Sequence, residues 1–220
     1  MELITLLGSP IGTDGLTLSF AVDEPAVLFD HRDASARTVP LGLREAGLTL
    51  LVIEPATPPK VFGDEVTAKE DALTSATATL GVASLRDVSV TDLARVRDRL
   101  DGPTYRVVRH VVTENQRVRD TLRMLRDEGP QGIGDLLYES HRSLRDDVQI
   151  SRPELDLAAE VSQNYGALGA RLTGSGDQLA VIALVPVGLV SQVQVSVDSA
   201  FAEHGYAQPE MYTVQPTESA

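Results

Sequence analysis

The chain has 220 residues, with 32 acidic and 19 basic side chains, a formal charge of −13 and no cysteine. This length allows one domain, or one domain and a fragment of another, with a well-buried core. The lack of cysteine excludes disulfides, thiolate zinc sites and thiol catalysis. The acidic charge would repel a phosphate-rich polymer, so we expect no nucleic acid partner. The four histidines show no metal-binding spacing, so we expect no metal ligands among them.

No apolar run reaches the roughly 18 residues that a membrane span needs. Residues 1–8 (MELITLLG) lack the basic region and the long apolar core of a secretory signal. We therefore expect a cytoplasmic protein without membrane contact.

The N-terminal third predicts strands joined by turns. Turn signals at Asp14-Gly15 and around Pro25 make the first 25 residues a loosely specified hairpin or loop. Compact apolar runs at residues 26–30 (AVLFD) and 48–54 (LTLLVIE) predict strands. Residues 55–63, with two adjacent prolines, predict an extended connector.

The middle of the chain predicts helices. They are expected at residues 64–80, ended by Gly81, then at 89–100, 103–128, 131–144 and 152–165. The helix over 103–128 has valines and leucines at near-helical spacing. Its arginines, Arg117, Arg119, Arg123 and Arg126, predict a solvated face or a surface for an acidic partner.

The C-terminal third predicts two strands around a turn at Gly174 and Gly176, a helix over 189–204 ended by Gly205, and a strand over 211–215. Strands interleaved with helices, without regular βαβ alternation, indicate an α+β protein: an antiparallel sheet with helices on one face. Small residues at the glycine turn let backbone approach a ligand phosphate or another loop.

Several ordered segments together resemble the C-terminal half of galactokinases, a branch of the GHMP kinase superfamily. The likeness extends from about residue 26 to the C-terminus. The segments that carry it are 39–54, 80–88, 109–118 (RHVVTENQRV), 140–147 (SHRSLRDD), 151–156 (SRPELD), 169–176 (GARLTGSG) and 210–216 (EMYTVQP).

This resemblance implies a ferredoxin-like C-terminal domain over residues 39–220, preceded by a remnant of the N-terminal kinase domain over residues 1–38. It also implies ATP-dependent phosphorylation of galactose at the C1 hydroxyl, with Mg²⁺ as cofactor. The residues carried over as nucleotide-binding are Thr173, Gly174, Ser175 and Gly176, since the family's C-terminal glycine motif closes over the active site.

The sequence departs from the family at the positions that carry the chemistry. No segment resembles the family's Gly- and Ser-rich phosphate loop or its N-terminal sugar motif. An ungapped alignment places Met1 at the catalytic Asp, whereas a one-residue deletion places Glu2 there, which makes Glu2 the one weak catalytic candidate. Val66 stands at the family's sugar-contacting Tyr, Asp177 enters the glycine motif, and Val148 replaces an aromatic residue.

The other polar motifs have plain structural explanations. His110, Glu114 and Asn115 lie on successive helical turns and could form a polar cluster with Arg109, but the favoured explanation is helix-surface pairing or a buried hydrogen bond. His141 with Ser140 and Ser143 lacks a nucleophile-elbow sequence. Asp146-Asp147 predicts a loop or cap.

Three hypotheses follow. In the first, the chain is the C-terminal half of a galactokinase-type enzyme and inactive alone; its N-terminal half is a separate polypeptide or is missing from the sequence as given, and self-association is the other arrangement. In the second, it is a degenerate kinase-like regulatory or protein-interaction module without phosphoryl transfer. In the third, it is a decayed gene product that exposes apolar surface.

Overall fold

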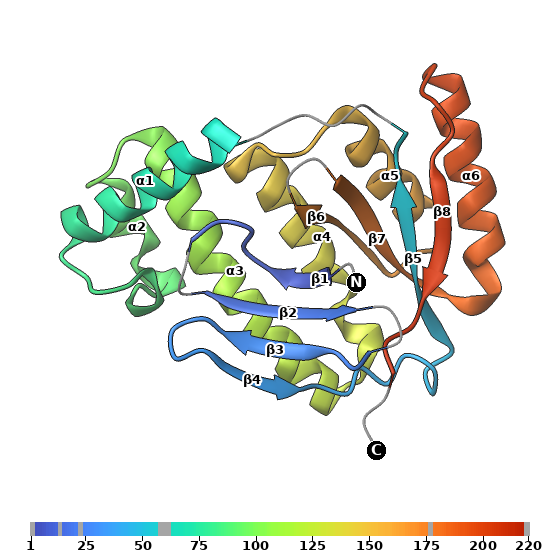
Figure 1. The fold of residues 1–220 in the computed structure, drawn as a ribbon, viewed down its shortest axis with the longest axis horizontal. Coiled ribbons are helices and arrows are strands. Elements are labelled where there is room, and N and C mark those ends of the chain that lie inside the picture. Colours follow the sequence, from blue (N-terminus) through green and yellow to red (C-terminus); the bar gives the residue numbers. More distant parts are fainter. Residues whose placement is uncertain (1–2, 13–14, 22–23, 57–62, 176–177, 218–220) are drawn as a thin grey trace.

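The structure is a computed structural model and describes residues 3–12, 15–21, 24–56, 63–175 and 178–217. Figure 1 shows two sheets and a group of helices, with the N-terminal strands lying across the front of the molecule.

The N-terminal sheet is an antiparallel meander in the order β1-β2-β3-β4. Its strands are β1 (Leu3–Gly8), β2 (Leu16–Ala21), β3 (Val27–Asp30) and β4 (Ser35–Thr38). Alternate residues of β2, such as Leu18 and Phe20, are buried at 0% and 1% exposure and face the protein interior. The expected loose hairpin or loop is a hairpin of β1 and β2 with a register shift between Thr5 and Leu7. β4 was not predicted, because all four of its residues are exposed and show no apolar alternation.

The C-terminal sheet is also antiparallel, as the sequence predicts, and its strand order is β6-β7-β5-β8. Its strands are β5 (Leu48–Glu54), β6 (Gly169–Ser175), β7 (Gln178–Pro186) and β8 (Glu210–Val214). The two central strands are continuous apolar runs, because both of their faces are covered. Leu50 and Leu51, which point to opposite faces of β5, are both fully buried.

Six α-helices complete the described fold: α1 (Gly63–Leu80), α2 (Leu93–Arg97), α3 (Gly102–Asp127), α4 (Gly134–Ser143), α5 (Pro153–Asn164) and α6 (Val190–Glu203). Asp101 caps α3, since its carboxylate accepts a hydrogen bond from the Thr104 amide at 2.9 Å. Asp146-Asp147, expected in a loop or cap, lies in a π-helical turn (Leu144–Val148) that continues α4.

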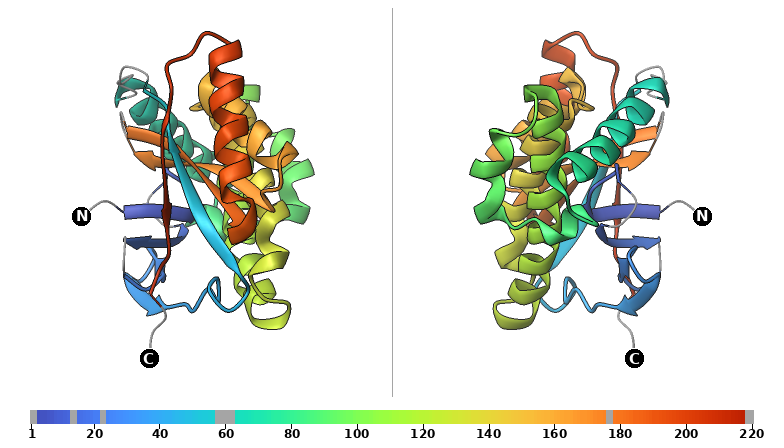
Figure 2. Two further views of the ribbon diagram at one scale, coloured as in Figure 1. Left: turned by 90° about the vertical axis from the view of Figure 1, so that its right-hand side faces the viewer. Right: turned by 90° about the vertical axis from the view of Figure 1, so that its left-hand side faces the viewer.

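The C-terminal sheet separates two hydrophobic cores. On one face, Leu51 and Ile53 pack with residues of α3, α5 and α6. On the other face, Leu50 and Val52 pack with the inner face of the N-terminal sheet and with residues of α3 and α4. Figure 2 shows this layering, with β1–β4 on the side away from α6. Within the described ranges, no helix combines the length and apolar character that crossing a membrane requires.

Candidate functional site

The predicted glycine motif lies at the tip of the β6–β7 hairpin. Gly174 pairs with Leu179 and Ser175 with Gln178, and the φ of Gly174 is +92°, which favours glycine. Gly176 and Asp177 lie outside the described residues, and so does Glu2. The described part of the predicted motif is therefore Thr173, Gly174 and Ser175, which pair with β7. Among the described residues, no group of three His, Asp or Glu side chains is placed to hold a metal ion.

Thr173 joins this turn to β1. Its hydroxyl donates to the Thr5 carbonyl oxygen at 3.0 Å and accepts from the Thr5 amide at 3.1 Å. Because Thr173 is only 5% exposed and both interactions are internal, its side chain positions β1 beside the glycine turn.

Arg171 fastens the same two strands from inside the protein. Its guanidinium donates to the carbonyl oxygens of Thr5 (3.0 Å) and Gly8 (2.9 Å), and its Nε donates to Ser140 Oγ (2.8 Å). Burial lowers the pKa of Arg171 to about 10, although Glu114 opposes the shift. A guanidinium with this pKa stays charged at neutral pH, so the interior holds a full positive charge here.

Glu114 balances that charge. Its Oε1 accepts from Ser140 Oγ at 2.6 Å and from the Gly8 amide at 3.2 Å, and lies 3.7 Å from Arg171 Nη2. Its Oε2 accepts from Arg117 Nε at 2.7 Å. Burial alone would raise the pKa of Glu114, but the two guanidinium groups outweigh it and lower the pKa to about 2. Arg117 is buried by this pairing, so the prediction that it belongs to a solvated face is wrong.

We call Glu114, Arg117, Ser140 and Arg171 the β1 clamp. They come from α3, α4 and β6: Glu114 and Arg171 bond the backbone of β1, Ser140 bonds both of them, and Arg117 pairs with Glu114. Asn115 adds a neighbouring contact, since its Oδ1 accepts from the Leu16 amide at 2.8 Å. The clamp is closed to solvent, so its carboxylate and hydroxyl serve to hold strands rather than to react with a ligand.

A second buried chain of hydrogen bonds starts at His110. Its Nδ1 lies 2.9 Å from Ser143 Oγ, which donates to Asp147 at 3.0 Å, and Arg109 pairs with the same Asp147. Burial lowers the pKa of His110 to about 4, so the ring is neutral at pH 7. The buried hydrogen bond that the sequence predicts is confirmed for His110, and Arg109 joins the same network only through Asp147.

His141 also has a structural role. Its Nδ1 accepts from the Leu172 amide at 3.2 Å, and its Nε2 lies 3.2 Å from a carboxylate oxygen of Asp156. It therefore links α4 to β6 and α5.

The two valines that replace aromatic residues of the resembled family differ in burial. Val148 is fully buried in the core that Leu51 and Ile53 share with α3, α5 and α6, whereas Val66 is half-buried on α1 and packs against that same core. The buried role of Arg171 was not predicted from the sequence. An arginine in a strand whose neighbours are apolar could have indicated a buried ion pair.

Comparison with known proteins identifies the relatives of this architecture. The family model for GHMP kinases, C terminal, matches residues 114–203. The galactokinase of Streptomyces coelicolor is 37% identical over 217 residues, covering 97% of this chain and 56% of the relative. The galactokinase of Mycobacterium tuberculosis is 38% identical over 204 residues, covering 92% and 56%. The chain thus spans about half the length of these curated relatives.

Solved structures with a similar fold also include a galactokinase. The galactokinase of Lactococcus lactis in complex with galactose superposes with a TM-score of 0.82 at 26% identity, covering 91% of this chain and 53% of that one. A mevalonate kinase from L. major, at 17% identity and a TM-score of 0.55, shares the fold alone. With its two antiparallel sheets, its helical layer and the matched segments, the chain belongs to the GHMP kinase family and corresponds to the C-terminal half of galactokinases.

Proposed function

We propose that this chain supplies the C-terminal half of a galactokinase-type active site, which phosphorylates galactose at its C1 hydroxyl. The observation that supports the proposal most is the hydrogen bonding of Thr173 to Thr5, which places the start of β1 beside the glycine turn. In the resembled family, a catalytic carboxylate directly precedes the segment that aligns with β1. The position of the catalytic carboxylate and the glycine turn would then be adjacent.

The proposed nucleotide contacts are the backbone of Gly174, Ser175 and Gly176, with Thr173 as the residue that positions them. When bound, ATP supplies the phosphoryl group and Mg²⁺ offsets its charge. With a one-residue deletion, Glu2 would stand at the position of the family's catalytic Asp, one methylene longer; in the ungapped alignment Met1 stands there and this chain supplies no catalytic carboxylate. Residues 1–38 belong, on this proposal, to the N-terminal kinase domain and residues 39–220 to the C-terminal one.

The active site also needs a phosphate loop and a sugar pocket, which this sequence lacks. A region that resembles the N-terminal half of galactokinases would provide both, in the cytoplasm, and self-association is the competing arrangement. We expect the chain to bind Mg-ATP weakly alone and to show no galactose-dependent ATP consumption.

A thermal-shift titration with Mg-ATP, with and without galactose, tests this function. A ligand that binds the folded state raises the melting temperature in a saturable manner. We expect such a shift for the chain, and its loss in Gly174→Val, because the side chain would be strained at φ +92° and would obstruct the turn. An equal shift in this variant, or turnover by the chain alone, would contradict the proposal.

One observation favours a second function, that of a degenerate regulatory or protein-interaction module. Val66 has no hydroxyl at the position where the family contacts the sugar. The variant Val66→Tyr separates the two functions: a galactose-dependent shift gained on this substitution favours a degenerate sugar pocket, whereas a galactose response already present in the wild type favours the enzyme half.

A further inference from the structure

A helix lies along the outer edge of β6. β6 is the first strand in the order β6-β7-β5-β8, so one of its edges pairs with β7 and the other faces out of the sheet. α4 runs against this outer edge, where Gly134 and Gly169 let the two backbones approach closely. The outer edge of a strand carries backbone N–H and C=O groups that no neighbouring strand bonds. Side chains of α4 are therefore placed to bond the backbone of β6.

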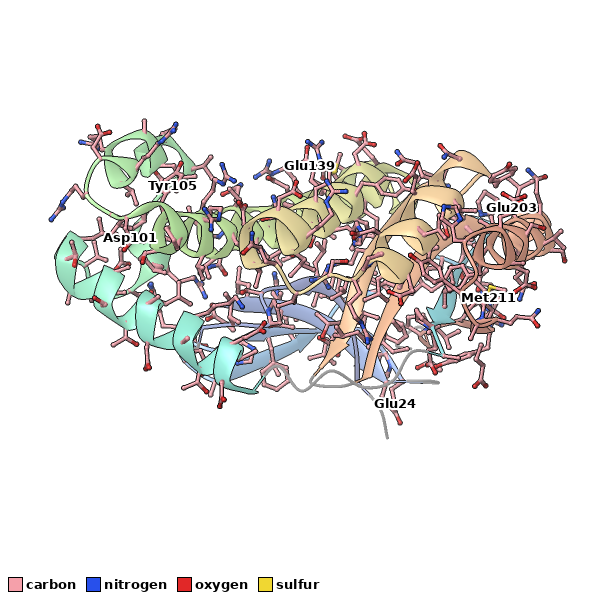
Figure 3. All side chains as sticks on the ribbon, turned by 90° about the horizontal axis from the view of Figure 1, so that it is seen from above. Glu24, Asp101, Tyr105, Glu139, Glu203 and Met211 are labelled. Carbon is pink, nitrogen blue, oxygen red and sulfur yellow. The ribbon has the colours of Figure 1, made fainter. Side chains whose placement is uncertain are left out.

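Two consecutive residues of α4 bond two consecutive residues of β6. Ser140 Oγ accepts from Arg171 Nε at 2.8 Å within the β1 clamp, and His141 Nδ1 accepts from the Leu172 amide at 3.2 Å. His141 is only 4% exposed. Figure 3 shows Glu139, by contrast, on the side of α4 that faces away from the N-terminal strands. The buried side of α4 therefore fixes the position of β6 at these two residues.

Gly174 directs its amide to the same edge as Leu172. In an antiparallel ladder, successive residues direct their N–H groups to opposite edges of the strand. The Leu172 amide points away from β7, because it donates to His141. The pairing of β6 with β7 continues without a register shift through Gly174, two residues further on. The bond to His141 therefore holds the edge that carries one of the proposed nucleotide contacts.

The bond from Leu172 defines the protonation state of His141. A ring nitrogen that accepts a hydrogen bond carries no proton, so the proton of the neutral ring is on Nε2. Nε2 lies 3.2 Å from Oδ1 of Asp156, and Ser151 Oγ donates to the same oxygen at 2.6 Å. A proton on Nδ1 would instead place one N–H group against another at Leu172. The contact with β6 therefore requires the Nε2–H tautomer.

Asp156 favours this tautomer. Burial alone would raise the pKa of Asp156, but its contacts with His141 and Ser151 outweigh burial and hold the pKa below its ordinary value. The Asp156 side chain is 31% exposed and lines a groove of about 450 Å³ between α4 and α5, so water also reaches the carboxylate. A charged carboxylate beside Nε2 attracts the ring proton and leaves Nδ1 as the acceptor.

We propose that His141, as the neutral Nε2–H tautomer, is a positioning residue for the glycine turn: it holds the outer edge of β6 so that the Gly174 amide faces the nucleotide. The inference rests on the proposed function, from which the ligand of the turn is taken. His141 acts through the backbone of Leu172 and not by contact with the ligand. Asp156 acts one step further away, by selecting the tautomer.

Nuclear magnetic resonance tests the tautomer directly. In protein with isotopically labelled histidine, a long-range proton–nitrogen correlation spectrum distinguishes a protonated ring nitrogen from an unprotonated one. The variant His141→Asn identifies the signals of His141 among those of the four histidines. We expect the Nε2–H pattern at neutral pH. A proton on Nδ1, in the other tautomer or in the imidazolium ion, would overturn the proposal.

Two variants of similar size separate the acceptor from the rest of the ring. The amide oxygen of His141→Asn can take the place of Nδ1, whereas His141→Leu has no acceptor, and both lose the contact with Asp156. We expect hydrogen exchange of the Leu172 amide to be about fivefold faster or more in His141→Leu, and within about twofold of the wild type in His141→Asn. The amide signal of Gly174 should move in His141→Leu and stay near its wild-type position in His141→Asn.

A titration with Mg-ATP, followed by the melting temperature, measures the effect on the turn. The apparent affinity should fall about fivefold or more in His141→Leu and remain within about twofold of the wild type in His141→Asn. Glu139→Gln is the control, since it changes an exposed side chain of the same helix, and its affinity should match the wild type. Melts without ligand give the stability of each variant, which separates a loss of folding from a loss of binding.

The outcomes separate positioning from function. Equal exchange of the Leu172 amide, or equal Mg-ATP affinity, in His141→Leu and His141→Asn overturns the positioning role, even if Mg-ATP stabilises the wild type. A wild type that does not respond to Mg-ATP contradicts the proposed function. In that case a difference between the two variants in exchange and in the Gly174 signal still supports the positioning role, and its absence overturns it.

Discussion

At the scale of single residues, the motifs that mark the family are mostly fold-forming contacts. The clamp carboxylate of Glu114 neutralises Arg117 and Arg171 in the interior. The variant Glu114→Gln keeps the shape but leaves two guanidinium groups without their counter-charge. We expect it to lower the free energy of unfolding by about 3 kcal/mol, measured by urea denaturation.

The matched control for this variant is on the same helix. Asp120→Asn removes a solvent-accessible pair with Arg123, whose side chain is 60% exposed, and should cost about 0.5 kcal/mol or less. Equal losses in the two variants would contradict a special role for the β1 clamp.

His110 should make stability fall in mild acid. Burial lowers its pKa in the folded protein to about 4, from 6.5 in the unfolded chain. Between pH 4 and 6.5 the unfolded chain binds a proton at His110 that the folded protein does not. The contribution of His110 to the free energy of unfolding is therefore fully present above pH 6.5 and falls by about 3 kcal/mol as the pH drops to 4.

The variant His110→Asn isolates this effect, because an amide can still donate to Ser143 but does not titrate. Denaturation series at pH 4 to 7 should show a flatter pH dependence for the variant than for the wild type. Identical slopes would exclude His110 as the source.

At the scale of elements, α4 and β6 touch backbone to backbone. A Cβ atom added to Gly134 would lie 2.0 Å from the Leu168 carbonyl oxygen, and one on Gly169 would lie 2.4 Å from the Gly134 oxygen. We expect Gly134→Ala to lower the free energy of unfolding by at least about 3 kcal/mol, as seen in its circular-dichroism melt. Gly188→Ala is the control, since no atom lies within 4 Å of the added Cβ; a similar loss there would argue against steric exclusion.

The elements differ in how far the sequence predicts them. β5 and β7 were predictable because continuous apolar runs are typical of strands covered on both faces. β4 was not, because its exposed residues Ser35–Thr38 have no apolar alternation and are held by pairing with β3. The glycine turn was predictable as a hairpin, whereas the contact of Thr173 with Thr5 spans 168 residues and depends on the whole fold.

At the scale of the whole molecule, the two sheets should unfold together. The C-terminal sheet contributes one face to each core, and the N-terminal sheet closes the second core through residues such as Leu18 and Leu28. Leu18→Ala removes a fully buried side chain and should cost about 2–5 kcal/mol. Because the core is shared, hydrogen exchange in peptides of β2 and β7 should shift to the same lower urea midpoint in this variant. If only the β2 peptide shifted, the N-terminal sheet would be a separately unfolding layer, which would contradict the shared core.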